Sequence, residues 1–322
     1  MPPSRLSLDR IARAAREIDG VFLHSPQFRA ESLGEALGVD LRLKVESVNP
    51  IRSFKGRGAD FFVREITDTA QPLVCASAGN FGQGMAYAAR RRGMTLDVFA
   101  SIRANPLKIA RMRAFGATVN QAGDDFDAAK DAARAYASAA GARYVEDGRE
   151  PAISEGAGSI GVELLDWRDG FDTLLVPLGN GALLGGVGTW VRAHAPGVRI
   201  VGVCAEGAPS MERSWREGRV IETESADTIS DGIAVRVPIV EALGDLSGVV
   251  DDVLLVDDLT TIDAMRRIFS HLGLVVEPAG AVGVAALMTH RAQFVGTRVA
   301  TILCGGNLTL TQISDYALTG AT

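Results

Sequence analysis

Residues 46–60 read Glu-Ser-Val-Asn-Pro-Ile-Arg-Ser-Phe-Lys-Gly-Arg-Gly-Ala-Asp and place one lysine, Lys55, between an extended run and an expected helix. The extended run covers residues 41–46, and the apolar pattern predicts a helix over residues 58–66. A lysine at such a junction is a candidate for a Schiff base, provided that its surroundings lower the pKa of the amine or that the amine is converted to an imine. Taken alone, the tripeptide Ser-Phe-Lys is more typical of a solvated helix start.

Three further glycine-rich turns each follow an apolar run that is typical of a strand. They lie at residues 77–84, 179–186 and 305–307. Short apolar runs alternate with helical patterns between them, which predicts βαβ units and a parallel sheet. Because open parallel sheets bind ligands beyond the carboxyl ends of their strands, we expect these turns and Lys55 to form one site.

The same patterns predict the positions of the elements. Strands are expected over residues 41–46, 72–75, 96–101, 118–121, 142–145, 173–178, 199–204, 252–256 and 298–304. Helices are expected over residues 7–20, 32–37, 58–66, 83–92, 106–115, 125–140, 160–167, 183–194, 210–218, 259–272 and 279–289.

Six different motifs follow one another through nearly the whole chain. They read N-P-I-R-S-F-K-G-R-G-A (49–59), S-A-G-N-F-G-Q-G (77–84), G-N-G-A-L (179–183), D-G-I-A-V (231–235), E-P-A-G-A (277–281) and C-G-G-N (304–307). In this order they resemble the motifs of the threonine/serine dehydratase family of pyridoxal-phosphate enzymes. The resemblance implies the fold-type II α/β architecture: two open, twisted, mostly parallel sheets flanked by helices. It also implies a small domain, residues 67–144, inserted into a large cofactor-binding domain made of residues 1–66 and 145–322.

The resemblance further implies pyridoxal 5'-phosphate as the cofactor and Lys55 as the catalytic residue that carries its imine. Phe54 is expected to lie along the cofactor ring, Asn80 to hydrogen-bond its phenolic oxygen, and Cys304 to face its pyridine nitrogen. The remaining cofactor contacts that it implies are Gly179, Asn180, Gly181, Ala182, Leu183, Gly232 and Glu277.

Each of these residues also has a plainer interpretation. The turn at residues 179–183 suits an anion at a helix start, but equally a βα turn without a ligand, and Glu206 lies near the distance that a dinucleotide site requires. Ala182 is the position in doubt, since alanine rarely adopts a positive φ. Phe54 and Cys304 are also typical of residues in a hydrophobic core. Glu277 is also typical of a residue that caps the next helix or places a negative charge near its start.

The turn that begins at Ser77 is expected to bind the substrate carboxylate; its members are Ser77, Ala78, Gly79, Asn80 and Phe81. The plainer alternative is an N-cap cluster for the next helix. Serine racemases, which are similar throughout, carry a hydroxyl at the position of Ala78, and alanine cannot transfer a proton. A thiol at Cys304 is a weak partner for a pyridine nitrogen, which favours prompt loss of a β-substituent.

These observations predict a carbon-oxygen lyase, an ammonia-lyase that converts L-threonine or L-serine to the 2-oxo acid and ammonia. The alternatives are a β-replacement enzyme, an amino-acid racemase, and a sensor that binds pyridoxal phosphate or an amino acid without turnover. Glu206 and Ser210 are candidate ligands for a structural cation, although their oxygen-ligand spacing is loose. The family usually forms dimers or larger assemblies, so we expect a homodimer.

Bulk properties exclude several other classes. The net charge of -6 over 322 residues argues against a nucleic-acid partner, which normally requires a basic face. No apolar run is long enough to cross a membrane, and the first 20 residues lack the apolar core of a signal peptide, so we expect a cytoplasmic protein. The three cysteines form no paired metal-binding spacing.

Overall fold

A computed structural model gives the structure of the chain and describes residues 3–318. Its larger β-sheet has six strands, and neighbouring strands are parallel except at one edge, where β1 runs antiparallel to β2. The strand order is β1 (Gln27–Arg29), β2 (Asp40–Val45), β10 (Arg298–Leu303), β7 (Thr173–Pro177), β8 (Arg199–Ala205) and β9 (Asp252–Val256). The short edge strand β1 was not predicted, because three residues without alternation give no strand pattern.

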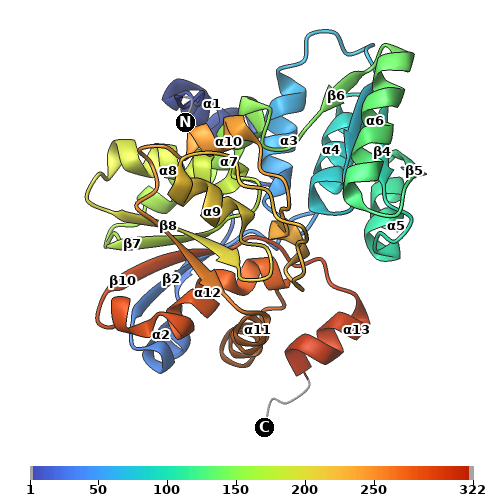
Figure 1. Ribbon diagram of the computed structural model, residues 1–322. Coiled ribbons are helices and arrows are strands. Elements are labelled where there is room, and N and C mark those ends of the chain that lie inside the picture. The colour runs from blue at the N-terminus through green and yellow to red at the C-terminus, as the bar shows by residue number, and fades with distance from the viewer. Residues whose placement is uncertain (1–2, 319–322) are drawn as a thin grey trace.

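The smaller sheet has four parallel strands, all from one continuous part of the chain. Their order is β5 (Thr118–Gln121), β4 (Leu96–Ala100), β3 (Leu73–Ala76) and β6 (Arg143–Val145). Figure 1 shows this sheet with its helices on the right, beside the larger sheet with its own helices. The predicted fold class, two mostly parallel sheets flanked by helices, is confirmed.

Helices connect the strands in the described part of the chain. They are α1 (Leu8–Glu17), α2 (Glu31–Leu37), α3 (Lys55–Arg64), α4 (Asn80–Arg91), α5 (Pro106–Ala114), α6 (Phe126–Ala140), α7 (Pro151–Leu165), α8 (Ala182–His194), α9 (Ser210–Glu217), α10 (Val240–Asp245), α11 (Asp258–Leu272), α12 (Pro278–Thr289) and α13 (Leu310–Gln312). Short helical turns are η1 (Asp231–Ile233), η2 (Arg291–Gln293) and η3 (Ile313–Leu318). None of the helices within residues 3–318 is long and apolar enough to cross a membrane.

Local signals explain where several helices begin and end. The side chains of Ser7, Asp125 and Asp257 accept hydrogen bonds from the first turns of α1, α6 and α11, as N-cap residues do. Gly38 ends α2 in the left-handed conformation, at φ 75°, which glycine adopts without steric cost.

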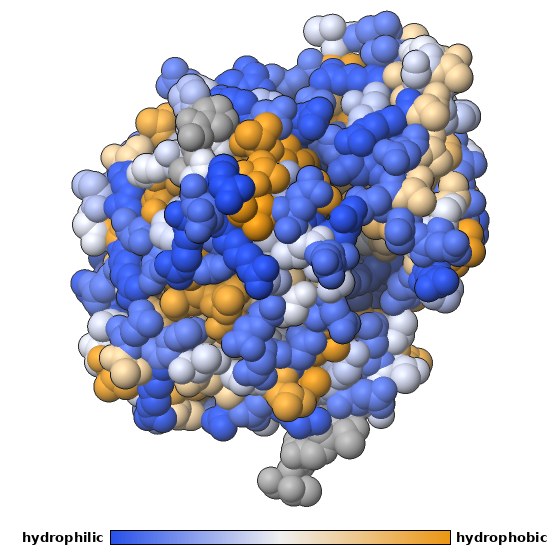
Figure 2. Space-filling view, viewed as in Figure 1, coloured by the Kyte–Doolittle hydropathy of each residue, from blue (hydrophilic) through white to orange (hydrophobic). Residues whose placement is uncertain are grey.

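Two hydrophobic cores lie against the two sheets. The larger core packs residues of the six-stranded sheet against α7, α8, α11 and α12. The second core joins the smaller sheet to α1, α3 and α4, with Phe61 and Phe62 of α3 buried in it. Helix α3, which carries Lys55 at its first position, therefore packs beside the smaller sheet, as Figure 1 shows. The outer face in the same view is mainly hydrophilic, and hydrophobic residues form separate patches on it (Figure 2).

The predicted start of the helix at residue 160 is wrong, since α7 begins at Pro151. Residues 151–159 contain two glycines and two serines, which lower helix propensity. The glycines instead permit close helix packing: a Cβ on Gly156 would lie 2.7 Å from the Arg57 carbonyl oxygen of α3, and one on Gly158 would lie 3.0 Å from the Gly186 carbonyl oxygen of α8. Tertiary packing has overridden local propensity here.

Candidate active site

Lys55 is the first residue of α3, and its amine is largely enclosed. The side chain is 11% exposed, and Nζ lies 4.7 Å from the centre of the Phe54 ring. Nζ also donates a hydrogen bond to Oδ2 of Asp147, in the loop between β6 and α7. Phe54, expected to lie along the cofactor ring, thus lies beside the Lys55 amine, and the carboxylate that contacts this amine was not predicted.

Phe54 and Cys304 are joined through the backbone. The Phe54 amide donates to the Cys304 carbonyl at 3.0 Å, and Ser53 forms an isolated antiparallel bridge with Gly305. The Cys304 thiol donates to the Ala279 carbonyl at 3.5 Å, and burial raises its pKa, with the charge of Glu277 acting in the same direction. Cys304 therefore stays a neutral thiol at the end of β10.

Glu277 lies at the centre of a buried polar cluster that joins both sheets. Its Oε1 accepts from Asn80 Nδ2 at 2.7 Å, and its Oε2 accepts from the Asn307 amide at 3.2 Å. The two asparagines also contact each other, with Asn307 Nδ2 donating to Asn80 Oδ1 at 2.8 Å. Residues 80, 277 and 307 thus bring three of the predicted motifs together.

Glu277 is buried, with 2% of the residue exposed, and this burial changes the titration of its carboxyl group. Removal from water is the main cause, and it raises the pKa of Glu277 to about 7. The charge of Lys108 opposes this rise, whereas that of Asp231 adds to it. A carboxyl group that titrates near neutral pH is suited to holding or releasing a proton.

The turn at residues 179–183 leads from β7 into α8, as predicted. Gly181 has a φ of 97°, which glycine tolerates, and Ala182 begins the helix itself. The doubt about Ala182 is thereby resolved, because the left-handed position falls on Gly181. The first backbone N–H groups of α8 have no partners within the helix and suit an anion. Asn180 Oδ1 accepts from the Ala182 amide at 3.4 Å.

The 3-10 turn η1 packs on the turn at residues 179–183, the candidate anion-binding turn. A Cβ on Gly179 would lie 3.0 Å from the Ile233 Cα, and one on Gly232 would lie 3.0 Å from the Ala279 Cβ and 3.7 Å from Glu277 Oε1. The absence of side chains at both glycines is what permits this approach. Gly232 therefore lies beside the Glu277 cluster, and its contact with the cofactor stays a prediction.

The turn at residues 77–81 caps α4 and leaves other groups available. Ser77 Oγ accepts from the amides of Gly79 at 3.2 Å and Gly82 at 2.9 Å. The Ser77 hydroxyl thus contacts the first turn of α4 through the Gly82 amide, although the N-cap residue is Gly79, which has no side-chain cap. The amides of Asn80 and Phe81, in the first turn of the helix, remain without intrahelical partners and suit a carboxylate. Ala78 offers a methyl group and no acid or base.

Sequence reasoning missed two cations of α5 that lie near this turn. Lys108 is 4% exposed, its ammonium lies 3.8 Å from the position of a Cβ on Gly79, and it pairs with Asp231. Burial lowers the pKa of Lys108, but the charges of Asp231 and Glu277 outweigh this effect, so that the pKa is raised. Arg111 Nη1 donates to Asn307 Oδ1 at 2.5 Å. The signal available in the sequence was the set of basic residues at positions 108, 111 and 113 after Pro106, which is also typical of a solvated face.

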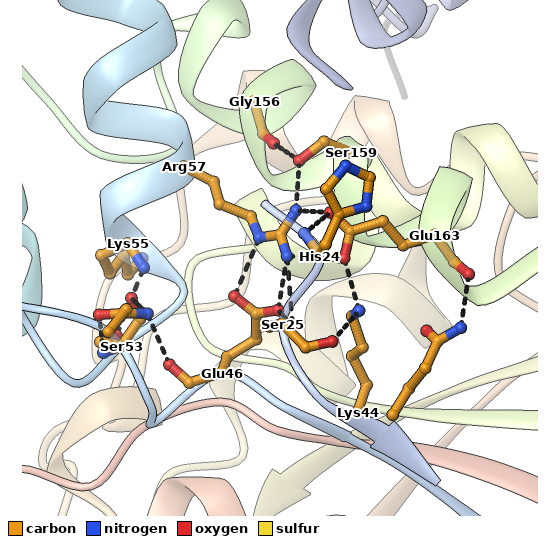
Figure 3. A network of polar contacts seen from close by, with 12 residues as sticks. His24, Ser25, Lys44, Glu46, Ser53, Lys55, Arg57, Gly156, Ser159 and Glu163 are labelled. Carbon is orange, nitrogen blue, oxygen red and sulfur yellow. Dashed lines mark hydrogen bonds and ion pairs between the residues drawn. The ribbon is translucent and has the colours of Figure 1, made fainter. Parts of the chain in front are cut away.

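A buried charge network anchors α3 at Arg57, two residues beyond Lys55 (Figure 3). The Arg57 guanidinium is fully buried; Nε donates to Glu46 Oε2 at 2.9 Å and Nη1 donates to Glu163 Oε1 at 2.6 Å. Lys44 Nζ donates to Glu163 Oε2 at 2.5 Å, and the Ser159 hydroxyl accepts from Arg57 at 3.0 Å. This network fixes the start of α3 against β2 and α7.

The network makes stability dependent on pH. Although burial raises it, the hydrogen bonds and charges of Arg57 and Lys44 lower the pKa of Glu163 to about 2. A depressed carboxyl pKa stabilises the folded state above the unfolded pKa and loses that contribution as the pH falls through 2. We expect the free energy of unfolding, measured in urea, to fall by about 3 kcal/mol from this group between about pH 5 and pH 2. Glu163→Gln should flatten that part of the curve, and an unchanged slope would contradict the assignment.

Of the two residues expected to hold a cation, one bonds to the backbone and the other is exposed to solvent. The Ser210 hydroxyl donates to the Val235 carbonyl at 2.6 Å, and Glu206 is exposed. Glu212, nearby on α9, pairs with Arg216. Across residues 3–318, no group of three or more His, Cys, Asp or Glu side chains is placed to hold a metal ion.

The chain is similar to known enzymes over nearly its whole length. It is 33% identical over 308 residues to an L-threonine ammonia-lyase of Geobacter sulfurreducens, covering 95% of this chain and 75% of that one. It is 31% identical to an L-threo-3-hydroxyaspartate ammonia-lyase of a Pseudomonas species, covering 95% and 96% of the two chains. The structure matches the processed form of threonine deaminase isoform 2 from Solanum lycopersicum with a TM-score of 0.90 and 27% identity, covering 99% and 96% of the two chains.

The family model described as pyridoxal-phosphate dependent enzyme matches residues 19–305. That span includes Lys55, the turn at residues 179–183 and the buried cluster around Glu277. The chain therefore belongs to the family of pyridoxal-phosphate-dependent enzymes.

Proposed function

We propose that this protein is an ammonia-lyase that converts L-threonine or L-serine to the corresponding 2-oxo acid and ammonia. The observation that carries the proposal is the enclosed amine of Lys55, at the start of α3 and against the Phe54 ring, in a chain of this family. The ammonia-lyase names of relatives at about one-third identity support the reaction class. Ala78 supports elimination over racemisation, because it supplies no second acid or base.

The residues present suit pyridoxal phosphate. The start of α8 at residues 179–183 offers backbone N–H groups without intrahelical partners for its phosphate, and Gly181 adopts the φ of 97° that the turn requires. Phe54 offers a surface for the ring, Asn80 an amide for a ring oxygen, and Lys55 an amine. The cofactor supplies an aldehyde that bonds to amines and a ring that withdraws electrons from the substrate.

The protein's own groups then perform the remaining work. Lys55 would hold the cofactor through its amine and, as a free amine, would take the α-proton of the substrate as the base. The amides of Asn80 and Phe81 hold the substrate carboxylate at the start of α4. Asn80 and Asn307 fix Glu277, which holds a proton near neutral pH. Loss of the α-proton and the β-hydroxyl together removes one water, and a second water hydrolyses the resulting enamine to the 2-oxo acid and ammonia.

The direct test measures 2-oxo acid formation by purified protein supplied with pyridoxal phosphate. The panel contains L-threonine, L-serine and L-threo-3-hydroxyaspartate. The third is included because a relative named L-threo-3-hydroxyaspartate ammonia-lyase aligns with 95% of this chain. Turnover of L-threonine or L-serine supports the proposal. A new amino acid formed from O-acetylserine and sulfide would instead indicate β-replacement, and D-serine would indicate racemisation. Bound cofactor without any product would indicate a sensor.

Glu277 gives a prediction on pH. Because burial raises its pKa to about 7, its charge changes within the working range of the enzyme. We expect an inflection near pH 7 in the profile of kcat/KM, and Glu277→Gln should remove it because an amide does not titrate. The same raised pKa means that the folded state loses stability as the pH rises from about 4.3 through 7. An inflection that persists in the Gln variant would assign the titration to another group.

Four further expectations stay predictions. We propose residues 67–144 as the small domain, and the smaller sheet, whose strands lie between Leu73 and Val145, supports this division. The homodimer, the cytoplasmic location and the cation at Glu206 and Ser210 remain open to measurement by sedimentation, cell fractionation and metal analysis.

A further inference from the structure

Asp147 is the carboxylate that contacts the Lys55 amine. It belongs to the loop between β6 and α7, and its side chain is 14% exposed. Oδ2 accepts the hydrogen bond from Lys55 Nζ, whereas Oδ1 is buried and has no hydrogen-bond partner among the described residues. A buried carboxylate oxygen without a partner is costly, so this placement calls for a reason beyond ordinary loop structure.

The loop around Asp147 is held in place by other groups. Arg5 donates to the carbonyls of Gly148 at 3.2 Å and Arg149 at 2.6 Å. The neighbouring carboxylate, Glu146, has its own cations in Lys130, Arg134 and Arg149. Among the described ion pairs, the Asp147 carboxylate therefore has Lys55 as its only cation.

The same loop packs on the anion-binding turn. Gly148 has a φ of 86°, and a Cβ there would lie 3.1 Å from the Asn180 carbonyl oxygen and 3.4 Å from Asn180 Cγ. Asp147 therefore links the Lys55 amine to the segment that touches residues 179–183. An ion pair that served stability alone would gain little here, because desolvation of two enclosed charges offsets their attraction.

We propose that Asp147 is a positioning residue for Lys55, which holds the Lys55 nitrogen against Phe54 and favours its positively charged form. The role in catalysis rests on the proposed function. When the cofactor is bound, a positively charged Lys55 nitrogen would withdraw electrons from the cofactor carbon bonded to it. A substrate amine would then attack that carbon more easily. The negative charge of Asp147, in contact with Nζ, favours that state by direct attraction.

The first test uses the protein without cofactor and reads Lys55 directly. An amine-acylating reagent modifies only the neutral amine, and mass spectrometry of the peptide that contains Lys55 gives the pH of half-maximal labelling. In Asp147→Asn we expect that pH to fall by about one to three units, the usual effect of an opposite charge at this distance. Asp147→Ser gives the same reading should the Asn variant fail to fold, and Asp147→Glu, which keeps the charge, should stay near the original value.

Glu150→Gln is the matched control. It removes one negative charge from the same loop, where Glu150 pairs with Arg143 at 3.2 Å and not with Lys55. Its labelling midpoint should equal that of the unmodified protein. An equal midpoint in Asp147→Asn and the unmodified protein would overturn the proposal.

The second test follows the absorbance of the protein loaded with pyridoxal phosphate across pH. The spectral midpoint should fall in Asp147→Asn and stay unchanged in Glu150→Gln. Failure of the proposed function is distinguishable, since it would appear as no 2-oxo acid formed from the amino acids of the panel by the unmodified protein, with or without cofactor bound at Lys55. The labelling midpoint would still decide the role of Asp147 toward the amine.

Discussion

Lys55→Ala should abolish 2-oxo acid formation, lowering kcat/KM for L-threonine by at least about 10⁴-fold, because one side chain serves as covalent anchor and as base. The fold should survive, since the amine side chain lies at the first position of α3 and the buried phenylalanines of that helix, Phe61 and Phe62, are untouched. The measurement combines product formation with the mass of borohydride-reduced protein, which should show a cofactor adduct only when Lys55 is present.

Lys130→Ala provides the control for this prediction. Lys130 lies on α6 and pairs with Glu146, so its removal also deletes one lysine but leaves the site unchanged. Activity and adduct mass should match the unmodified protein. Turnover retained in Lys55→Ala would remove Lys55 from the mechanism, whatever the fate of the fold.

The parts of the site that were predictable are those encoded in contiguous residues. A strand followed by a glycine-rich turn and a helix fixes locally where backbone N–H groups point, and the turn at residues 179–183 has that form. The order of several such turns in an alternating chain implies where they meet, at the carboxyl ends of parallel strands. The Glu277 cluster met this expectation.

Contacts between distant side chains were not predictable in this way. Asp147 lies 92 residues from Lys55, in a loop that reads Glu-Asp-Gly-Arg-Glu and is typical of a solvated turn. Lys108 likewise belongs to a helix whose basic residues suggest an exposed face. Which charges become buried depends on the packing of α3, α5 and η1, and no local pattern carries that information.

Arg57→Met is expected to lower the free energy of unfolding by about 3–5 kcal/mol, the usual cost of removing one partner from a buried ion pair. Figure 3 shows why: the guanidinium lies between Glu46 and Glu163, and its loss leaves both carboxylates facing each other with Lys44 as the remaining cation. Lys55, two residues earlier, depends on the same start of α3, so activity should also fall. Thermal and urea unfolding, followed by circular dichroism, measure the loss.

Arg64→Met separates this effect from the mere removal of an arginine. Arg64 lies on the same helix and pairs with Asp60 at 2.6 Å, but its side chain is 37% exposed, so the expected cost is about 1 kcal/mol or less. An equal loss in the two variants would contradict the special role of the buried network.

Acid offers a second separation, because Glu163 in the unmodified protein stays ionised until the pH falls to about 2. Without Arg57 the Glu163 carboxylate loses the main group that keeps it charged, and its protonation removes its repulsion with Glu46. The difference in stability between Arg57→Met and the unmodified protein should therefore shrink as the pH falls from about 6 toward 3. A difference that stayed constant would mean that lost packing, and not uncompensated charge, explains the destabilisation.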